Sequence, residues 1–322
     1  MQALLREMAF FLLDTGKVQR IRNRLDIPLL MVLWIMATPD SFRSVALRFG
    51  VRPGSVHDNY SFIIEALRDM SPRYIQWPDR EERALIKERF QRYSGFPGIV
   101  GALDGTYQNV TAPRVHPQSY INRHHQYSLN TMVVADDNLL IRYLKVGEVG
   151  SMHDSRVFRR SPLYMELLRN ENDYLSDDEH IVGDSAYAVT NFLMTPYRNL
   201  GRLTEQQTQF NRQLSRCRVR IEHTFGKAFG QWRRMLESSN IDLALDHFTA
   251  SYVLHNFMIL TGEEIINLDQ PDQFPQRLLE QNDDADEEED VEEPVQNAEF
   301  IRLVNRAKRL GVEKRRIITE NM

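Results

Sequence analysis

The apolar positions of the chain follow a helical period as far as about residue 94. Within this stretch a short amphipathic run ends at Gly50, a turn follows, and Ser55 can cap a second helix that continues to about residue 69. The second helix carries an apolar stripe at helical spacing, made of Val56, Tyr60, Ile63, Ile64 and Leu67. The pattern predicts a helical region over residues 1–94 that contains a helix-turn-helix.

The second helix of this motif offers few groups that could contact DNA. His57 and Asn59 are its candidate DNA-binding residues, and they stand beside the acidic Asp58. Many helical hairpins show the same pattern without touching DNA, so DNA binding and simple packing both stay open.

From residue 95 the pattern changes to shorter apolar runs. The first covers residues 96–104, two β-rich runs at 127–135 and 139–146 predict a hairpin, and residues 180–183 form a brief strand. Helical patterns cover residues 154–170, 201–236 and 246–261. Three strands, a helix, a strand and further helices is the order found in the ribonuclease-H-like fold. We therefore expect an α+β protein in which residues 95–262 form a mixed-sheet domain with flanking helices.

The C-terminal part of the chain differs in composition. Residues 263–297 are rich in acids, Asn, Gln and Pro and predict a disordered linker. Its acidic core, residues 283–293, holds nine acids and no base, and without it the formal charge of the chain changes from −5 to +4. Residues 298–322 predict a final basic helix.

Composition narrows the classes of protein further. The single cysteine, Cys217, excludes an intrachain disulfide and a cysteine-based zinc site, which favours a reducing compartment such as the cytosol or nucleus. The apolar run 27–37 has eleven residues, too few to span a bilayer, so no membrane association is expected. Basic residues gather between residues 198 and 234, around a glutamate, and this segment is a candidate surface for a polyanion.

Three acidic residues stand where packing does not readily explain them. Asp104 and Asp184 each end an apolar run that reads as a buried strand, and Glu222 lies in the arginine-rich helix. Buried carboxylates are usually paired or bound to a metal, and converging carboxylates suit Mg²⁺ or Mn²⁺. Each also has an ordinary explanation: a turn residue for Asp104, a helix cap for Asp184, and an ion pair with Arg218 for Glu222.

Four motifs in order resemble those of Harbinger-type DDE transposases and their domesticated nuclease relatives. They are Gly-Ala-Leu-Asp-Gly-Thr at 101–106, Gly-Ser-Met-His-Asp-Ser-Arg-Val-Phe at 150–158, Gly-Asp-Ser-Ala-Tyr at 183–187 and Arg-Ile-Glu-His-Thr-Phe-Gly at 220–226. The sequence departs from the family pattern at Tyr107, where histidine is usual, and at Ala186-Tyr187-Ala188, where Gly-Tyr-Pro is usual. The resemblance covers about residues 30–262.

The resemblance implies a nuclear, metal-dependent endonuclease that cuts DNA by two-metal-ion hydrolysis and can transfer the cut strand. It also implies a Myb-like DNA-binding partner protein, and a homodimer is a further expectation. The expected catalytic acids are Asp104, Asp184 and Glu222, with Asp154 added as a metal ligand or, alternatively, as part of a helix capping box. The expected contacts to the DNA backbone are Arg216, Arg218, Arg220 and Lys227.

The sequence leaves two roles open for Tyr187 and two alternatives to the endonuclease function. Tyr187 could stack on an unpaired base or simply pack in the core. The chain could be a domesticated DNA-binding or scaffold protein that has lost cleavage, or a metal phosphohydrolase acting on small phosphates. The long basic segment and the helix-turn-helix argue against the small-phosphate alternative.

Overall fold

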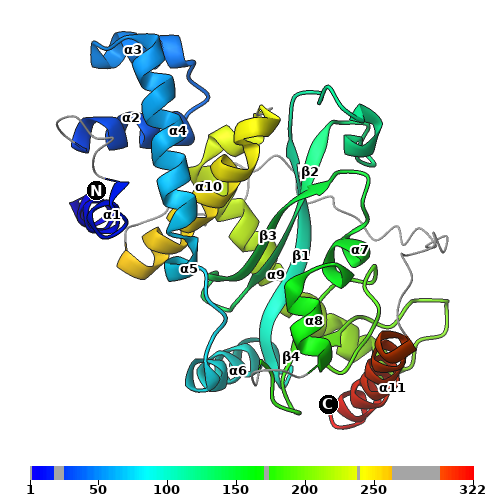
Figure 1. Ribbon diagram of the computed structural model, residues 1–322. Helices are drawn as coiled ribbons and strands as arrows, with labels where there is room; N and C mark the ends of the chain where they lie inside the picture. The colour runs from blue at the N-terminus through cyan, green and yellow to red at the C-terminus, as the bar shows by residue number, and fades with distance from the viewer. Residues whose placement is uncertain (1, 18–24, 170–173, 238–239, 263–297) are drawn as a thin grey trace.

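A five-stranded mixed sheet organises the chain in the computed structural model, which describes residues 2–17, 25–169, 174–237, 240–262 and 298–322 (Figure 1). The strands are β1 (Ile99–Asn109), β2 (Ser128–Ala135), β3 (Ile141–Val149), β4 (His180–Val182) and β5 (Leu193–Met194). Their order in the sheet is β3-β2-β1-β4-β5, with the first three antiparallel and the last two parallel to β1. This is the predicted ribonuclease-H-like arrangement.

The predicted hairpin is confirmed as β2 and β3, but the predicted end of the first strand is wrong. β1 continues for five residues beyond Asp104, because its backbone pairs with β2 from Ala102 to Asn109. Asp104 lies opposite Val133 in the middle of this ladder. The short edge strand β5 gave no recognisable pattern in the sequence, since two residues are too few to show a period.

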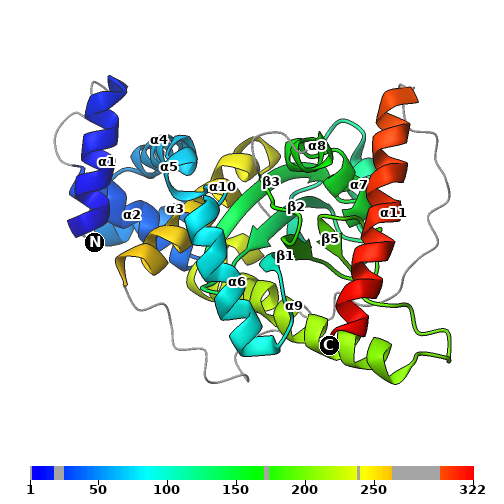
Figure 2. The same ribbon diagram turned by 90° about the horizontal axis from the view of Figure 1, so that it is seen from below.

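The helices cover both faces of the sheet, with α9 and α10 on one face and α7 and α8 on the other (Figures 1 and 2). The predicted helix at 154–170 is two helices, separated at Arg160 and Ser161. The bounds are α1 (Gln2–Asp14), α2 (Asp26–Ala37), α3 (Phe42–Phe49), α4 (Pro53–Asp69), α5 (Ser71–Tyr74), α6 (Arg80–Ser94), α7 (Asp154–Arg159), α8 (Pro162–Arg169), α9 (Glu205–Gln231), α10 (Ile241–Thr261) and α11 (Ala298–Glu320).

The helix-turn-helix pattern corresponds to α3 and α4. Gly50 ends α3 in the left-handed conformation, at a φ of 65°, which glycine adopts without steric cost. α4 begins at Pro53 rather than at the predicted cap Ser55, because proline is well tolerated in the first turn of a helix. The predicted stripe of α4 is buried in full, and it packs against α10. The stripe therefore joins the helical region to the sheet domain.

One hydrophobic core runs from the N-terminal helices to the sheet. It includes Leu12 of α1, Ile64 of α4, Ile99 of β1 and Phe257 of α10. A second core lies on the other face, where Val100 and Leu103 of β1 meet α7 and α8. The predicted boundary at residue 94 between a helical region and a sheet domain stays a prediction. Helix α6, which lies before this boundary, packs directly on β1 and α9.

The C-terminal helix α11 lies along the edge of the sheet beside β5 (Figure 2). The Lys314 ammonium donates to the carbonyls of Glu179 and Asn191, at 2.7 and 3.0 Å. Gly311 rests on the backbone of Thr190, where a Cβ atom would come within 2.3 Å of the Thr190 carbonyl carbon. The predicted C-terminal helix is thus present, and it covers an otherwise open sheet edge. The predicted linker 263–297 lies outside the described residues.

None of the helices in the described parts of the chain is long and apolar enough to cross a membrane.

The buried ion pair between Arg83 of α6 and Glu179 ties α6 to β4, with Arg83 Nε 2.7 Å from Glu179 Oε2. We predict that Arg83→Ala lowers the free energy of unfolding by about 3 kcal/mol, because the buried Glu179 loses a charged partner and keeps only Lys87. Urea unfolding of both proteins measures the change. The exposed pair Arg92–Glu88 provides the matched control, and Arg92→Ala should cost less than about 1 kcal/mol. Equal losses in the two variants would contradict the prediction.

Candidate active site

Asp104 is buried in the central strand β1. Its Oδ1 accepts a hydrogen bond of 2.8 Å from the Gly105 N–H, and its Oδ2 lies 3.8 Å from Nη2 of Arg218. Burial raises the pKa of Asp104 to about 8, the Arg218 guanidinium opposes this, and the nearby Asp184 and Asp154 carboxylates raise it further. The proposed turn role for Asp104 is wrong, since the residue lies inside a strand ladder.

Asp154 begins α7 and lies across β1 from the other face. Its carboxylate occupies the space where a side chain on Gly105 would stand, and an added Cβ would lie 2.4 Å from Asp154 Oδ1. The glycine after Asp104 is therefore required for close approach. Asn130 Nδ2 on β2 donates to Asp154 Oδ1 at 2.6 Å, while burial raises the Asp154 pKa and the Asp184 carboxylate adds to the rise. The capping-box alternative is wrong, because His153 occupies the cap position and no side chain caps α7.

Asp184 follows β4 and brings a third carboxyl group to the same place. Its Oδ1 accepts a hydrogen bond of 3.0 Å from the Ala186 N–H, so it also shapes the turn that follows the strand. Its negative charge raises the pKa values of both Asp104 and Asp154. Three sequence motifs thus meet as one electrostatically coupled group of aspartates, which we call the aspartate cluster (Asp104, Asp154 and Asp184).

Tyr187 lies in the core beside the cluster. Its ring packs edge-on against Phe158 at 5.9 Å, so the base-stacking alternative is wrong and the packing alternative is confirmed. Burial raises the pKa of Tyr187 well above its usual value, and all three aspartates raise it further. The hydroxyl group therefore stays protonated and lies within electrostatic reach of the whole cluster.

Helix α9 carries Glu222, and it packs against β1, β2 and β4. Arg218 and Glu222 are four residues apart and so share one helix face, which is the face that brings Arg218 to Asp104. The helix starts with a capping box in which the Thr204 hydroxyl accepts from the Gln207 N–H and the Gln207 side chain accepts from the Thr204 N–H. The role of Glu222 as the third catalytic acid stays a prediction.

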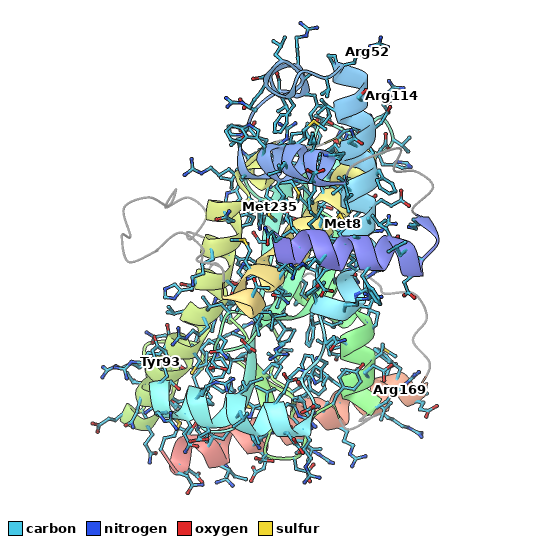
Figure 3. The ribbon with its side chains drawn as sticks, turned by 90° about the vertical axis from the view of Figure 1, so that its left-hand side faces the viewer. Met8, Arg52, Tyr93, Arg114, Arg169 and Met235 are labelled. Atoms are coloured by element: carbon cyan, nitrogen blue, oxygen red, sulfur yellow. The ribbon has the colours of Figure 1, made fainter. Side chains whose placement is uncertain are left out.

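The other predicted DNA-backbone contacts lie on a different face of α9. Arg216, Arg220 and Lys227 fall on one line along the helix, at spacings of four and seven residues. Arg216 is exposed, and the Arg220 guanidinium lies 4.2 Å from the ring centroid of Tyr93, labelled in Figure 3 at the end of α6. The positive charge of Lys227 helps to lower the pKa values of His223 and His255. The structure thus separates Arg218, beside the cluster, from the other three.

The two predicted contacts of the helix-turn-helix, His57 and Asn59, lie in the first half of α4. His57 is exposed and its ring meets the edge of Phe42 at 5.8 Å, whereas Asn59 is half-buried. Arg52, at the start of α4, and Arg114, in the β1–β2 connection, lie at the same end of the molecule in Figure 3. DNA binding by this motif stays a prediction.

The chemistry of the cluster fits a hard divalent cation. Carboxylates supply oxygen ligands, and the buried Asn130 Oδ1 has no hydrogen-bond partner within the described structure, which leaves an amide oxygen beside Asp154. Two donors at the cluster, Tyr187 Oη and Arg218 Nε, are likewise without an acceptor in that part of the chain. As the side chains stand, no group of three or more His, Cys, Asp or Glu among the described residues is arranged to hold a metal ion.

Sequence reasoning missed Asn130, Tyr107 as a neighbour of the cluster, and Arg123. The positive charge of Arg123 lowers the pKa values of Asp154 and Tyr107, so this residue of the β1–β2 connection lies near the cluster. Asn130 sits in an otherwise apolar strand pattern, and this polar interruption was the one available signal. No periodic pattern marks Arg123, because it lies in a connection.

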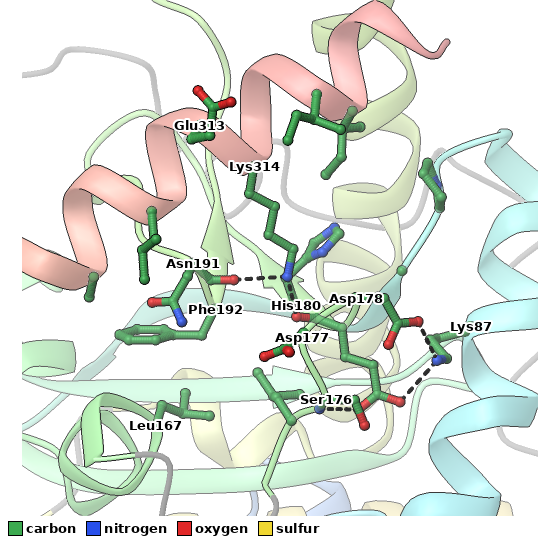
Figure 4. Close-up of a pocket in the computed structure, with 18 of the residues that line it drawn as sticks. Lys87, Leu167, Ser176, Asp177, Asp178, His180, Asn191, Phe192, Glu313 and Lys314 are labelled. Atoms are coloured by element: carbon green, nitrogen blue, oxygen red, sulfur yellow. Dashed lines mark hydrogen bonds and ion pairs between the residues drawn. The ribbon is translucent and has the colours of Figure 1, made fainter.

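A separate cavity of about 930 Å³ lies between α6, α8 and α11, at the opposite end of β4 from Asp184 (Figure 4). Its charged groups are engaged with one another: Lys87 contacts Asp178 and Glu179, and Lys314 donates to backbone carbonyls. Burial lowers the Lys314 pKa to about 8. The cavity contains no residue of the aspartate cluster, so this cavity and the candidate chemistry are at different places.

This part of the chain is similar to known proteins. Residues 103–259 match the family described as DDE superfamily endonuclease. The chain is 26% identical over 210 residues to "Protein ALP1-like" of Arabidopsis thaliana. The aligned region covers 62% of this chain and 51% of that protein. It is 26% identical over 223 residues to "Putative nuclease HARBI1" of Homo sapiens, covering 67% and 62%, and 29% identical over 151 residues to the Xenopus laevis protein of the same name, covering 46% and 42%.

The chain spans about half of the first relative and about three fifths of the second. No solved structure matches it. The matched segment holds all four expected acids. It also holds the whole sheet except the first four residues of β1, which precede residue 103. The resemblance to Harbinger-type DDE transposases and their domesticated nuclease relatives is therefore confirmed, since residues 103–259 match the DDE superfamily endonuclease family and the relatives carry names of that group.

Proposed function

We propose that the protein is a metal-dependent DNA endonuclease whose reaction centre is the aspartate cluster together with Glu222. The observation that carries this proposal is the electrostatic coupling of Asp104, Asp154 and Asp184, which come from three separate segments. Burial and the Asp184 charge raise the pKa values of both Asp104 and Asp154, and carboxyl groups placed in this way favour a counter-ion. Hydrolysis of DNA phosphodiesters is the proposed reaction, with strand transfer as a further step of the same site.

The residues that would hold Mg²⁺ or Mn²⁺ are Asp104, Asp154, Asp184 and Glu222. When bound, such ions activate the attacking oxygen and stabilise the leaving oxygen of an in-line displacement. A cation would also remove the mutual repulsion that keeps the carboxyl groups from converging, because it binds their charged forms.

The surrounding side chains have distinct roles in this proposal. Asn130 fixes the orientation of the Asp154 carboxylate through its 2.6 Å hydrogen bond. Arg218, 3.8 Å from Asp104, supplies a positive charge that can hold a non-bridging phosphate oxygen beside the cluster. Arg216, Arg220 and Lys227 would hold the DNA backbone further along α9 without reading sequence.

The relatives named as putative nucleases support a nuclease, while the substrate and the metal remain part of the proposal. Nuclear localisation, a Myb-like partner and a homodimer are proposed with it, on the family resemblance alone. The competing function is a DNA-binding or scaffold protein without cleavage, and the first experiment below separates the two.

The first prediction concerns cleavage. The purified protein should nick duplex DNA with Mg²⁺ or Mn²⁺, and Asp184→Ala should reduce the rate by more than about 100-fold, since even outer-shell changes at metal sites cost about 10–100-fold. Asp177→Ala is the control, because Asp177 is exposed at the other end of β4 and should retain the rate. A wild-type protein that binds duplex DNA but never cuts it would establish the scaffold function instead.

The second prediction concerns pH in the absence of metal. The pKa of Asp104 is about 8 in the folded protein against an ordinary 3.8, so the folded state keeps a proton that the unfolded state releases. This group therefore costs stability as pH rises from about 4 to about 8. Asp104→Asn should stabilise the chelator-treated protein more at about pH 9 than at about pH 5, by about 1 kcal/mol or more. Urea unfolding at both values measures it, and an equal effect at the two would contradict the assigned shift.

The third prediction concerns the basic face of α9 formed by the exposed Arg216 and the half-buried Arg220 and Lys227. Replacing Arg216, Arg220 and Lys227 with alanine should weaken binding to all DNA sequences and reduce the salt dependence of affinity by roughly one slope unit per lost contact. The matched control removes three exposed charges from α11, namely Arg302, Lys308 and Arg309. If both triple variants show the wild-type slope, the face of α9 is simply solvated.

A further inference from the structure

The β1–β2 connection forms a rigid turn beside the aspartate cluster. Asn122 is buried, and its Oδ1 accepts hydrogen bonds from the N–H groups of His124 and Gln126, at 2.9 and 3.1 Å. The Asn122 N–H donates to the Gln126 carbonyl at 2.9 Å, and Ile121 pairs with Tyr127 as an antiparallel bridge. These bonds fix residues 122–126 as one unit, which we call the Asn122 turn.

The Asn122 turn presents a basic tip to solvent. Arg123, His124 and His125 are consecutive and exposed, and His125 adopts the left-handed conformation at a φ of 58°. Hydrogen bonds between a side chain and the backbone hold such a turn in one conformation before a ligand binds. The conformational entropy cost of binding is therefore smaller. The sequence between residues 110 and 127 carries no acid, so the tip is not neutralised by its own connection.

Tyr107 links this tip to the cluster. It lies on β1, three residues beyond Asp104, and its ring meets the Arg123 guanidinium at 6.0 Å and the His124 ring edge-on at 6.3 Å. The Asp154 carboxylate and burial raise the pKa of Tyr107 to about 12, while Arg123 opposes the rise. Tyr107 thus touches the basic tip with its ring and lies within reach of Asp154.

A phosphate held near the aspartate cluster would face two positive groups from different elements. Arg218 reaches Asp104 from α9, and Arg123 reaches Asp154 from the β1–β2 connection. A nucleic-acid strand carries a phosphate at every nucleotide, so it can contact both groups while one phosphodiester lies at the cluster.

We propose that the Asn122 turn is a second backbone clamp for DNA, with Arg123 and His124 as its phosphate contacts and Tyr107 as the platform that positions them. The inference rests on the proposed function in one respect, that DNA is the substrate. It adds a contact outside α9 and outside the helix-turn-helix. It also assigns a role to Tyr107, one of the two places at which this chain departs from the family pattern.

The test measures duplex DNA binding in a metal-free buffer with chelator, so cleavage does not enter the readout. Arg123→Ala should lower the slope of log affinity against log salt by about 0.9, which makes the defect shrink about 3.5-fold between 50 and 200 mM salt. Arg302→Ala, an exposed arginine on α11, is the matched control and should leave the slope unchanged. An Arg123→Ala slope equal to that of Arg302→Ala overturns the clamp.

Two further variants separate a contact from a structural effect. Arg123→Lys keeps the charge and should restore the slope, whereas Tyr107→Leu keeps Arg123 but removes its platform and should weaken binding several-fold with the slope retained. Thermal unfolding of each variant verifies that it is folded. A wild type that binds with the expected Arg123 dependence but does not nick DNA overturns the endonuclease proposal alone, and one that nicks DNA without any Arg123 effect overturns the clamp alone.

Discussion

The proximity of three carboxyl groups beside one strand, with Asp104 buried and Asp154 and Asp184 half-buried, is the constraint on which the candidate site depends. A charged carboxylate in a buried place loses its hydration, and neighbouring carboxylates add repulsion, so the pKa of Asp104 rises to about 8. Such an arrangement is costly unless protons, cations or positive side chains compensate it. At neutral pH Asp104 therefore keeps its proton unless a cation binds, and perturbed pKa values of this kind are common at functional sites.

Several features of the fold make this cluster geometrically attainable. Gly105 leaves the space that the Asp154 carboxylate occupies against β1, and Asn130 donates to that carboxylate in a 2.6 Å hydrogen bond. Arg218 approaches from α9 with the opposing charge. The three come from strand β1, strand β2 and helix α9, so the sheet and the helix packed on it position the site jointly. A change at Asn130 would alter the pKa of Asp154, and a change at Arg218 would alter the pKa of Asp104.

Helix α9 divides its charges between two tasks because of its period. Arg218 and Glu222, four residues apart, share the face beside the core, while Arg216, Arg220 and Lys227 line another face. The helical period thus places one arginine beside the aspartate cluster and three other basic residues on another face. The Asn122 turn extends this basic surface from a different element, with Tyr107 joining it to the strand that carries Asp104.

The sequence by itself determined the elements and the identity of the acids. Hydrophobic period predicted the helices before residue 94, the β2–β3 hairpin and the apolar stripe of α4, because these depend on local spacing. Four motifs predicted the family. Only the tertiary structure decided that Asp104 lies within a strand and that the Asp154 carboxylate lies against Gly105. It also decided which residues are neighbours of the cluster, namely Asn130, Tyr107 and Arg123. These facts arise from pairing between β1 and β2 and from packing between distant segments, which leave no period in the chain.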